Sequence, residues 1–421
     1  MPAPLLRRRA PDQVTPRRSC AVDESTLAAA AVIVKDVRER GTEALLEHAV
    51  RLGDLAEGEP FVLGPSDLAA SLDEIPAPTR SLLERTMERI RAFAEAQRAC
   101  LRDLDVEVPG GRAGHTIEPV ERAGCYAPGG RFPLPSSVLM TAVAARVAGV
   151  RTVWVASPRP TAVTRAAAAL AGADALLAVG GAQAIAALAY GAAPVPPCDV
   201  IVGPGNRWVT AAKKLVAGEA GIDFLAGPSE LVVLADDEAD PECAAADLLA
   251  QAEHDPDALP VLIARSAAFA DAVDRALARQ LEDLSTAPTA RRALAGGFAV
   301  VAPILDAALE LCDRLAPEHL ELLVADPVSA AARLHHYGAL FLGPRSAEVL
   351  ADYGVGPNHV LPTGGVARSS GGLSVFHFLR VRTWLSMDGD PSDRARMAAD
   401  AETLARLEGL EAHARAAARR A

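Results

Sequence analysis

The sequence predicts an α/β protein built on parallel sheets, and three observations lead to this prediction. Short β-branched runs alternate with alanine-rich helical segments from about residue 119 to 235. A second series of the same kind runs from residue 241 to 342, and charged segments with helical periodicity fill residues 25–105. Strand–helix alternation at this spacing is typical of a doubly wound parallel sheet. We therefore expect two such domains, both incomplete Rossmann-like units, with helical segments at each end of the chain.

The individual elements are expected in the following order. In the N-terminal region, helices are expected at residues 26–40, 41–51 and 78–102. In the first alternating series, helices are expected at residues 136–148, 182–190 and 207–217, and strands at residues 151–156, 175–179, 199–202 and 230–235. In the second series, helices are expected at residues 241–253, 266–281 and 305–315, and strands at residues 260–264, 298–301, 320–324 and 339–342.

The C-terminal tail, residues 391–421, is predicted to be helical and unable to form a core alone. Leu404, Leu407 and Leu410 lie on one side of it, and Gly409 is expected to interrupt the helix. With so few large apolar residues, the tail has to pack on another part of the protein or on another subunit.

Length and composition restrict the class of protein. A chain of 421 residues is too long for one compact core, and 50% apolar residues exclude wholesale disorder. A formal net charge of −12 argues against nucleic acid or an anionic membrane as partner. An anionic cofactor remains compatible with this charge, because backbone amides at helix starts bind phosphates.

Targeting and redox signals favour a soluble cytoplasmic protein. The six cysteines show no paired C-x-x-C spacing, and only Cys125, beside a glycine-rich loop, is a candidate catalytic thiol. Arg7, Arg8 and Arg9 are not followed by the apolar segment of a signal peptide. The nearly uncharged stretch 166–197 is broken by glycines, an aspartate and prolines, so we interpret it as a buried strand between helices.

Gln251 and His254 are candidate metal ligands. They lie on a helix that has Asp240 as its N-cap. Because they are three residues apart, their Cβ atoms are about 5–6 Å apart on one face of this helix. On the last turn of that helix, they are expected to face the loop region where sites of open α/β sheets collect. The alternative is that both side chains only cap the helix and form hydrogen bonds.

Glu318 and His319 are a candidate acid–base pair. A carboxyl group beside an imidazole joins the two commonest proton-handling groups, and the flanking leucines indicate a buried element. The alternative is a solvent-facing pair at the start of a strand. An aspartate, Asp352, and a histidine, His359, flank a further glycine loop.

Three glycine loops are candidate anion sites, at residues 124–131, 203–207 and 227–230. The first loop contains Arg131 and precedes a helix that starts with Ser136 and Ser137. This combination suits an anion, although such loops are mostly turns. No G-x-G-x-x-G follows a strand. We interpret His48, His115, His335, His336 and His377 as ordinary surface or core histidines.

Taken together, these motifs resemble the histidinol dehydrogenase family. The matching pieces are GCYAPGGRFPLPSSVLM, VGGAQAIAALAYG, VGPGNRWVTAAKKLV, IDFLAGPSELVVLAD, AQAEHD, APEHLEL, GPNHVLPT and EGLEAH, in the family order from about residue 25 to the end. The residue before Asp352 is alanine where the family usually has glycine, and Ser369 stands where an aromatic residue is common.

The resemblance implies oxidation of L-histidinol to L-histidine through an enzyme-held aldehyde, with two NAD⁺ reduced. It implies one Zn²⁺ per subunit, held by Gln251, His254, Asp352 and, from a partner subunit, His413. Glu318 and His319 would be catalytic, with His319 as general base for the alcohol and Glu318 activating water. Substrate contacts would come from Ser229, Gln251, His254, His319, Asp352, His359, Glu408 and His413, and NAD contacts from Tyr126, Gln183 and Asn206.

The resemblance also implies a homodimer with shared active sites and a division into domains. We expect an N-terminal arm over residues 1–24 and a first α/β domain over residues 25–120 and 230–375, which carries the metal and catalytic residues. Residues 121–229 would form the NAD-binding domain, and the helical tail, 376–421, would reach the partner. Because Glu408 and His413 are five residues apart, a bend at Gly409 is needed to direct both to one site.

Two other functions remain open. One is a related NAD-dependent dehydrogenase of another small polar alcohol, against which Glu408 and His413 argue. The other is a non-catalytic metal- or nucleotide-binding relative, which would have no use for Glu318 and His319.

Overall fold

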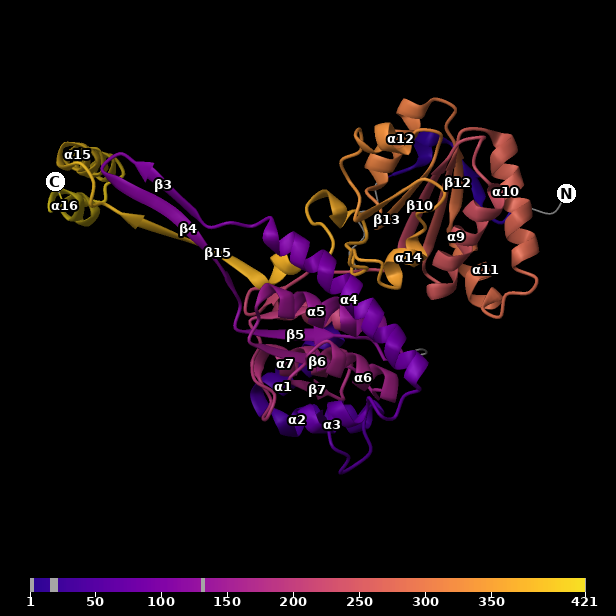
Figure 1. Ribbon diagram of the computed structural model, residues 1–421, viewed down its shortest axis with the longest axis horizontal. Coiled ribbons are helices and arrows are strands. Elements are labelled where there is room, and N and C mark those ends of the chain that lie inside the picture. The colour runs from indigo at the N-terminus through magenta and orange to yellow at the C-terminus, as the bar shows by residue number, and fades with distance from the viewer. Residues whose placement is uncertain (1–3, 16–21, 130–132, 421) are drawn as a thin grey trace.

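The computed structural model describes residues 4–15, 22–129 and 133–420, and it contains two six-stranded sheets and a three-stranded arm (Figure 1). The first sheet, here the β5 sheet, has the order β2 (Val62–Leu63), β7 (Ala175–Leu177), β6 (Thr152–Ala156), β5 (Arg122–Tyr126), β8 (Val200–Val202) and β9 (Gly221–Ile222). All its strand pairs are parallel except β2 with β7. Cys20, Gly130 and Arg131 lie outside the described residues.

The second sheet, here the β10 sheet, is parallel in every pair. Its order is β1 (Arg7–Arg9), β12 (Phe298–Val301), β11 (Leu259–Ala264), β10 (Glu230–Ala235), β13 (His319–Leu323) and β14 (Ala339–Leu342). The prediction of an α/β fold with parallel sheets is thus confirmed. The central strands β10 and β11 are nearly continuous apolar runs because both faces of the sheet are covered there, as expected for buried parallel strands.

Helices cover both faces of the β10 sheet. One core joins Leu231 and Val233 to α9 (Pro241–His254), α10 (Ala267–Gln280) and α11 (Ala287–Gly296). The other joins Val232 and Leu234 to α12 (Leu305–Leu315) and α13 (Pro327–Ala331). Alternate residues of β10 therefore face different helices, as the two-residue period of a strand requires.

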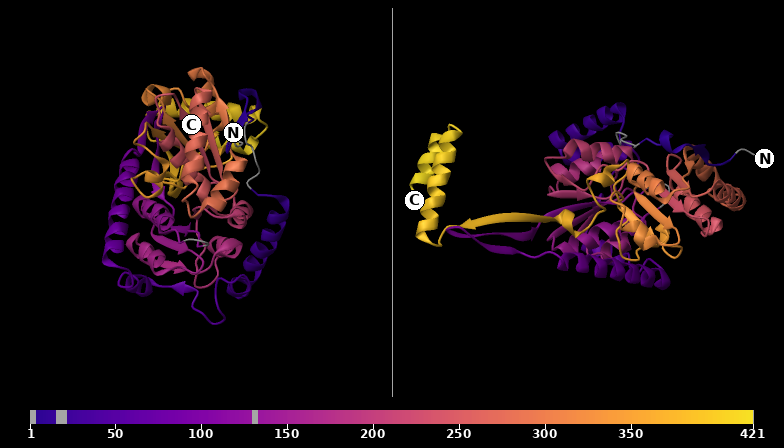
Figure 2. Two further views of the ribbon diagram at one scale, coloured as in Figure 1. Left: turned by 90° about the vertical axis from the view of Figure 1, so that its right-hand side faces the viewer. Right: turned by 90° about the horizontal axis from the view of Figure 1, so that it is seen from above.

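The N-terminal helices share the core of the β5 sheet. The helices of this half are α1 (Glu24–Arg40), α2 (Thr42–Arg51), α3 (Pro65–Ala70), α4 (Ala77–Ala99), α5 (Pro135–Ala148), α6 (Ala162–Leu170), α7 (Gly181–Tyr190) and α8 (Arg207–Val216). Helix α1 packs on α7 and α8, α4 packs on α5 and α6, and α1 and α4 lie on opposite sides of the molecule (Figure 2). The apolar stripe of α1, with Val34 and Val37, is buried against this sheet. These helices thus pack with residues 121–229, whereas the sequence leads us to expect residues 25–120 to group with 230–375.

Within the expected N-terminal arm, residues 1–24, one described segment is a strand. Arg7–Arg9 forms β1, which adds to the edge of the β10 sheet beside β12. Arg8 pairs with Asp271 and Asp274, at 2.9 and 2.7 Å, and the Arg9 guanidinium lies 4.2 Å from the ring centre of Phe298. Charged side chains on an edge strand also discourage pairing with other chains.

A long arm projects from the two sheets (Figure 1). It consists of the antiparallel strands β3 (Leu104–Val108), β4 (Gly111–Pro119) and β15 (Leu379–Ser386), with α15 (Pro391–Leu407) and α16 (Glu411–Ala418) at its far end. The expected helical tail, 376–421, thus begins with a strand. Gly409 separates its two helices at φ +77°, as predicted. Among the described residues, no helix is long and apolar enough to cross a membrane.

Candidate active site

The predicted acid–base and metal-ligating residues gather at the amino edge of the β10 sheet. Glu230 and His319 are the first residues of β10 and β13. Helix α9 follows β10 and runs back, so its last turn, with Gln251 and His254, reaches the same edge. We had expected that turn to face the loops at the carboxyl ends of the strands. The direction of α9 relative to β10 corrects this.

His319 is held as a neutral base. Its side chain is 4% exposed, and Nδ1 lies 3.1 Å from the backbone oxygen of Glu230. A carbonyl oxygen only accepts, so Nδ1 carries the proton and donates it. The other nitrogen, Nε2, is buried without a partner in the described part of the chain. Burial lowers the pKa of His319 to about 3, so Nε2 holds a free lone pair at neutral pH.

Glu318 is a buried carboxyl group with its own anchor. Its Oε2 accepts a hydrogen bond from the backbone nitrogen of Glu230 at 2.9 Å and lies 3.7 Å from Nδ1 of His319. Burial raises the pKa of Glu318 well above its usual value, and the carboxylates of Glu230 and Asp352 add to the rise. The Ser229 side chain, hydrogen-bonded to Glu318, opposes it. A carboxylate with a raised pKa is a stronger base when it is ionised.

A cluster that could hold a metal ion lies beside this pair. One ligand atom from each of His254, Glu348 and Asp352 lies within 4.8 Å of the others. Gln251 is 0% exposed, yet neither atom of its amide has a hydrogen-bond partner among the described residues. Buried polar groups are seldom left unpaired, so these atoms fit a ligand.

Glu348 was not predicted from the sequence. It begins α14 (Glu348–Asp352), and its Oε1 lies 3.7 Å from Nδ1 of His319. Its spacing of four residues from Asp352 puts both carboxyl groups on one helical face, a signal that was available. Burial raises the pKa of Glu348, and the pKa of Asp352 rises to about 6, also by burial. A bound cation would offset this cost of burying carboxylates together.

His359 occupies a supporting position. Its Nδ1 lies 2.9 Å from the backbone oxygen of Asp352, and its Nε2 lies 3.2 Å from the hydroxyl of Ser137. Both ring nitrogens therefore have partners, and the side chain ties the Asp352 loop to the start of α5. A contact with substrate stays a prediction.

Glu408 and His413 are not brought to this site within one chain. Both are exposed, on α15–α16 at the far end of the arm (Figure 1). Leu404, Leu407 and Leu410 on the same helices are 58%, 80% and 44% exposed, so the tail has an uncovered apolar face in a single chain.

A cavity of about 760 Å³ lies on the other sheet, at the carboxyl ends of its strands. Tyr126, Gln183 and Asn206, the three predicted NAD contacts, all line it. The backbone nitrogen of Gly181 donates to the Tyr126 hydroxyl at 3.1 Å. Asn206 caps α8 by accepting from the backbone nitrogens of Trp208 and Val209. This volume falls within the usual range of cofactor pockets.

The glycine loop before Asn206 is fixed by a buried ion pair. Lys213 contacts Asp223 and donates to the Gly203 oxygen at 2.9 Å, while Asp223 accepts from the Gly203 nitrogen at 2.7 Å. Gly203 has φ +117°, and a Cβ atom there would lie 2.0 Å from the backbone oxygen of Tyr126. Only glycine fits this position.

Cys125 is not suited to act as a nucleophile. It lies in β5, completely buried, and burial raises the pKa of its thiol to about 12. A reactive cysteine requires a thiolate near neutral pH, so this candidate from the sequence is not supported.

A buried carboxyl–imidazole pair beside a cluster that could hold a metal ion, with a separate cofactor-sized cavity on a second sheet, is typical of an enzyme of the α/β class. Comparison with known proteins gives the family. The family model described as histidinol dehydrogenase matches residues 16–421. The chain is 46% identical over 398 residues to the histidinol dehydrogenase of Ruegeria pomeroyi, covering 92% of this chain and 90% of the relative.

Two further comparisons agree. The histidinol dehydrogenase of Thermus thermophilus is 45% identical over 404 residues, with 95% of each chain covered. The crystal structure of histidinol dehydrogenase from Elizabethkingia anophelis superposes with a TM-score of 0.93 at 27% identity, covering 100% of this chain and 99% of that one. The chain therefore belongs to the histidinol dehydrogenase family, which confirms the predicted membership and the prediction of a dehydrogenase enzyme.

Proposed function

We propose that this chain is a zinc-dependent L-histidinol dehydrogenase. It oxidises L-histidinol to L-histidine through L-histidinaldehyde, reduces two NAD⁺, and so performs the last two steps of histidine biosynthesis in the cytoplasm. The observation that carries the proposal is the buried Glu318–His319 pair next to the unpaired amide of Gln251, in a chain of this family.

The donor set fits a zinc ion. Imidazole, carboxylate and amide oxygen from His254, Asp352 and Gln251 would hold the ion, and the unpaired Gln251 amide supports a ligand there. His413 of the partner subunit would complete the set. When bound, zinc would act as a Lewis acid that holds the substrate through its imidazole and amino nitrogens.

The first oxidation requires a proton acceptor, and we assign this role to Nε2 of His319. Its Nδ1 is committed to the Glu230 oxygen, so only Nε2 has a free lone pair for the hydroxyl proton of L-histidinol. NAD⁺, when bound, accepts the hydride in each of the two oxidations.

The second oxidation requires a water molecule, and we assign its activation to Glu318. The carboxylate takes a proton from water as the water oxygen attacks the aldehyde carbon, which forms the monoanion of the aldehyde hydrate. Loss of a hydride from this carbon to the second NAD⁺ then gives the acid. The Glu230 backbone nitrogen fixes Oε2 of Glu318, and the Ser229 side chain is hydrogen-bonded to the same carboxyl group. Ser229 and His359 would line the substrate position.

NAD would bind in the cavity of the β5 sheet, in contact with Tyr126, Gln183 and Asn206. The starts of α7 and α8 lie at this cavity, so the positive ends of their helix dipoles would favour a pyrophosphate there.

The arm supports the proposal of a homodimer. We propose that the tail of each chain reaches the site of its partner and supplies Glu408 for substrate and His413 for the metal. The exposed apolar face of α15 and α16 supports this, because an uncovered face of this kind is typical of an interaction site.

The test is NADH formation by purified protein with L-histidinol. We expect two NADH and one L-histidine for each substrate consumed, and NADH formation about 10²–10⁴-fold slower from the His319→Asn variant under the same conditions. One NADH per substrate, or faster turnover of another small polar alcohol, would favour the related dehydrogenase instead. Zinc and NAD binding without any turnover would favour the non-catalytic relative.

A further inference from the structure

The cavity of the β5 sheet has a charge pattern that bears on which dinucleotide it accepts. Among the described residues that line it, three are charged: Arg51, Asp54 and Arg159. NADP differs from NAD by a 2′-phosphate on the adenosine ribose. Whether this cavity accepts that phosphate depends on whether the carboxylate or the arginines lie next to it.

One wall of the cavity is apolar and exposed. Val32 on α1 is 68% exposed and Leu52 is 52% exposed, and Ile33 and Trp208 continue the wall. Large apolar side chains at the surface of a cavity suit a flat aromatic ligand, and the adenine ring of a dinucleotide is such a group. The group joined to adenine is a ribose, whose hydroxyls are hydrogen-bond donors. Two charged residues close to Leu52 in the chain line the cavity, Arg51 and Asp54, and of these only the Asp54 carboxylate can accept from a ribose hydroxyl.

Asp54 is anchored to the loop that carries a predicted cofactor contact. Its Oδ2 accepts from the backbone nitrogen of Gly180 at 2.9 Å and from Nε2 of Gln183 at 2.9 Å. For its Oδ1, no hydrogen bond is found among residues 4–15, 22–129 and 133–420. The carboxylate is thus held in place through one oxygen while the other is available to a ligand.

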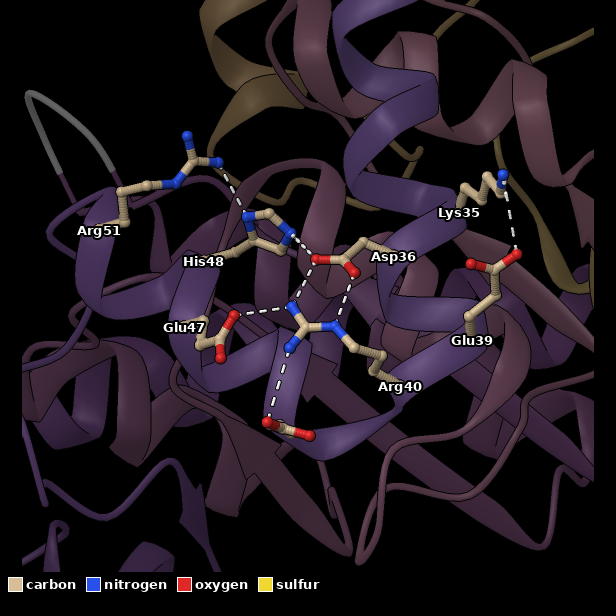
Figure 3. A network of polar contacts seen from close by, with 8 residues as sticks. Lys35, Asp36, Glu39, Arg40, Glu47, His48 and Arg51 are labelled. Atoms are coloured by element: carbon tan, nitrogen blue, oxygen red, sulfur yellow. Dashed lines mark hydrogen bonds and ion pairs between the residues drawn. The ribbon is translucent and has the colours of Figure 1, made fainter.

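Of the two arginines, Arg51 is held by a polar contact, and Arg159 has an unusual backbone conformation. In Figure 3, Arg51 stands at the end of a chain of polar contacts: Nη2 of Arg51 lies 2.8 Å from Nδ1 of His48, and Nε2 of His48 lies 2.8 Å from Oδ2 of Asp36. Arg159 has a left-handed backbone with φ 45°, between two prolines. Backbone strain of this kind in a non-glycine residue is most common at functional sites.

We propose that Asp54 makes the cavity selective for a dinucleotide with a free ribose 2′-hydroxyl, NAD rather than NADP. Its free oxygen accepts a hydrogen bond from the 2′-hydroxyl of the adenosine ribose, and its negative charge repels a 2′-phosphate. An acidic residue in this role is known from Rossmann folds, although this chain has no such fingerprint and brings the group from a different segment, after α2. The inference rests on the proposed function, since it takes the cavity to hold the cofactor.

The arrangement leads to an unusual expectation for the variants. Without Asp54, Arg51 and Arg159 remain to attract a phosphate. The Asp54→Ser variant should therefore use NADP better than wild type in absolute terms. If the substitution only damaged the site, the activities with NAD and with NADP would both fall.

The experiment measures kcat/KM with NAD and with NADP, and the equilibrium binding of both by calorimetry, for wild type, Asp54→Ser and Asp54→Asn. We expect NAD binding to weaken by about 10-fold, and the NADP to NAD ratio to rise by about 10- to 100-fold, the usual worth of a hydrogen bond to a charged group. Glu57→Gln is the matched control, because it removes a nearby exposed carboxylate that does not line the cavity, and its ratio should equal that of wild type.

Two results would overturn the inference. One is a wild-type enzyme that binds NADP as tightly as NAD. The other is an equal loss with both dinucleotides in the Asp54 variants, which would make Asp54 a purely structural anchor for Gln183. A wild-type protein that reduces neither dinucleotide with L-histidinol contradicts the proposed function itself, and the binding measurements still decide the selectivity.

Discussion

The two parallel sheets present their polar groups at opposite edges. In the β5 sheet, Tyr126, Gln183 and Asn206 lie at the carboxyl ends of the strands, where open α/β sheets usually bind ligands. In the β10 sheet, Glu318 and His319 lie at the amino ends. Two sheets of the same size and strand direction therefore offer different edges to chemistry.

Helix direction explains what each edge is suited to bind. At the carboxyl edge of the β5 sheet, α7 and α8 begin, so the positive ends of their helix dipoles lie at this edge and favour an anion. At the amino edge of the β10 sheet, α9 ends at His254, so carbonyl groups and the negative end of its dipole favour a cation. The contrast supports a dinucleotide on one sheet and a metal ion on the other.

The two halves also differ in how they bury charge. Below the β5 cavity, the buried Lys213 is paired with Asp223. Beside the β10 site, the buried carboxyls of Glu318, Glu321 and Glu348 are near one another, and burial raises the pKa of each. Buried pairs support structure, whereas clustered like charges are expensive and typical of functional sites.

Removing the metal should disable one edge only. We expect chelation to abolish L-histidinol oxidation and added Zn²⁺ to restore it, while NAD binding in calorimetry stays unchanged. Wild type should hold about one zinc per chain and His254→Ala much less, because the set has one site per chain. His335→Ala, an exposed histidine paired with Asp313, is the control. Full activity in metal-free protein would refute the metal site.

Replacing the base should separate the two oxidation steps. His319→Asn removes the proton acceptor, and alcohol oxidation should slow by about 10²–10⁴-fold, the usual contribution of general base catalysis. Glu318→Gln should mainly slow the oxidation of L-histidinaldehyde. Stopped-flow measurement of each half-reaction decides this, with the dissociation constant of NAD as the control for the β5 sheet. Equal losses in both steps for both variants would contradict the assigned roles.

Mixing two inactive variants should test whether the amino-edge site is shared. If His413 acts on the partner, a mixed dimer of His254→Ala and His413→Ala has one site that lacks both ligands and one that is intact. With random pairing about half of the dimers are mixed, so activity should recover to roughly a quarter of wild type. Each variant refolded alone is the control. Confirmed mixed dimers without activity would place His413 in the site of its own chain.

Local pattern predicted the two sheets well because their elements are buried. Strands 230–235, 298–301 and 339–342 and helix 305–315 were predicted with the observed bounds. The arm was missed for the opposite reason. Its strands β3 and β15 are mostly exposed, and β15 pairs with β4, more than two hundred residues earlier in the chain. Register of that kind depends on a distant partner and leaves little trace in local hydrophobicity.

The site shows the same division between local and distant information. Glu318, His319, Gln251 and His254 stand in short motifs, and the sequence was enough to single them out. Asp54 reaches Gly180 across 126 residues, and only the fold shows this contact. The edge was mispredicted although a signal existed: a helix that follows a parallel strand runs back along the sheet, so its last turn lies at the amino ends.

The smallest expected effect concerns the buried carboxyls of the β10 sheet outside the proposed ligand set. Burial and the neighbouring Asp247 raise the pKa of Glu321 to about 9, so this group is protonated in the folded protein at pH 7 and ionised in the unfolded chain. The unfolded state then binds fewer protons, and stability falls as pH rises from about 4.5 towards 9.

The variant Glu321→Gln tests this, because glutamine keeps the shape of the side chain, provides a donor for Asp247 and does not titrate. We expect the free energy of unfolding of this variant to equal that of wild type near pH 5 and to be larger by about 1–2 kcal/mol at pH 8. This is only part of the free energy that corresponds to the pKa shift of Glu321. Urea unfolding of the metal-loaded protein at both pH values measures this, with the exposed Glu57→Gln as control. If the difference in free energy of unfolding between the variant and wild type does not change with pH, Glu321 is ionised in the folded protein. The two sheets would then differ less in how they bury charged groups.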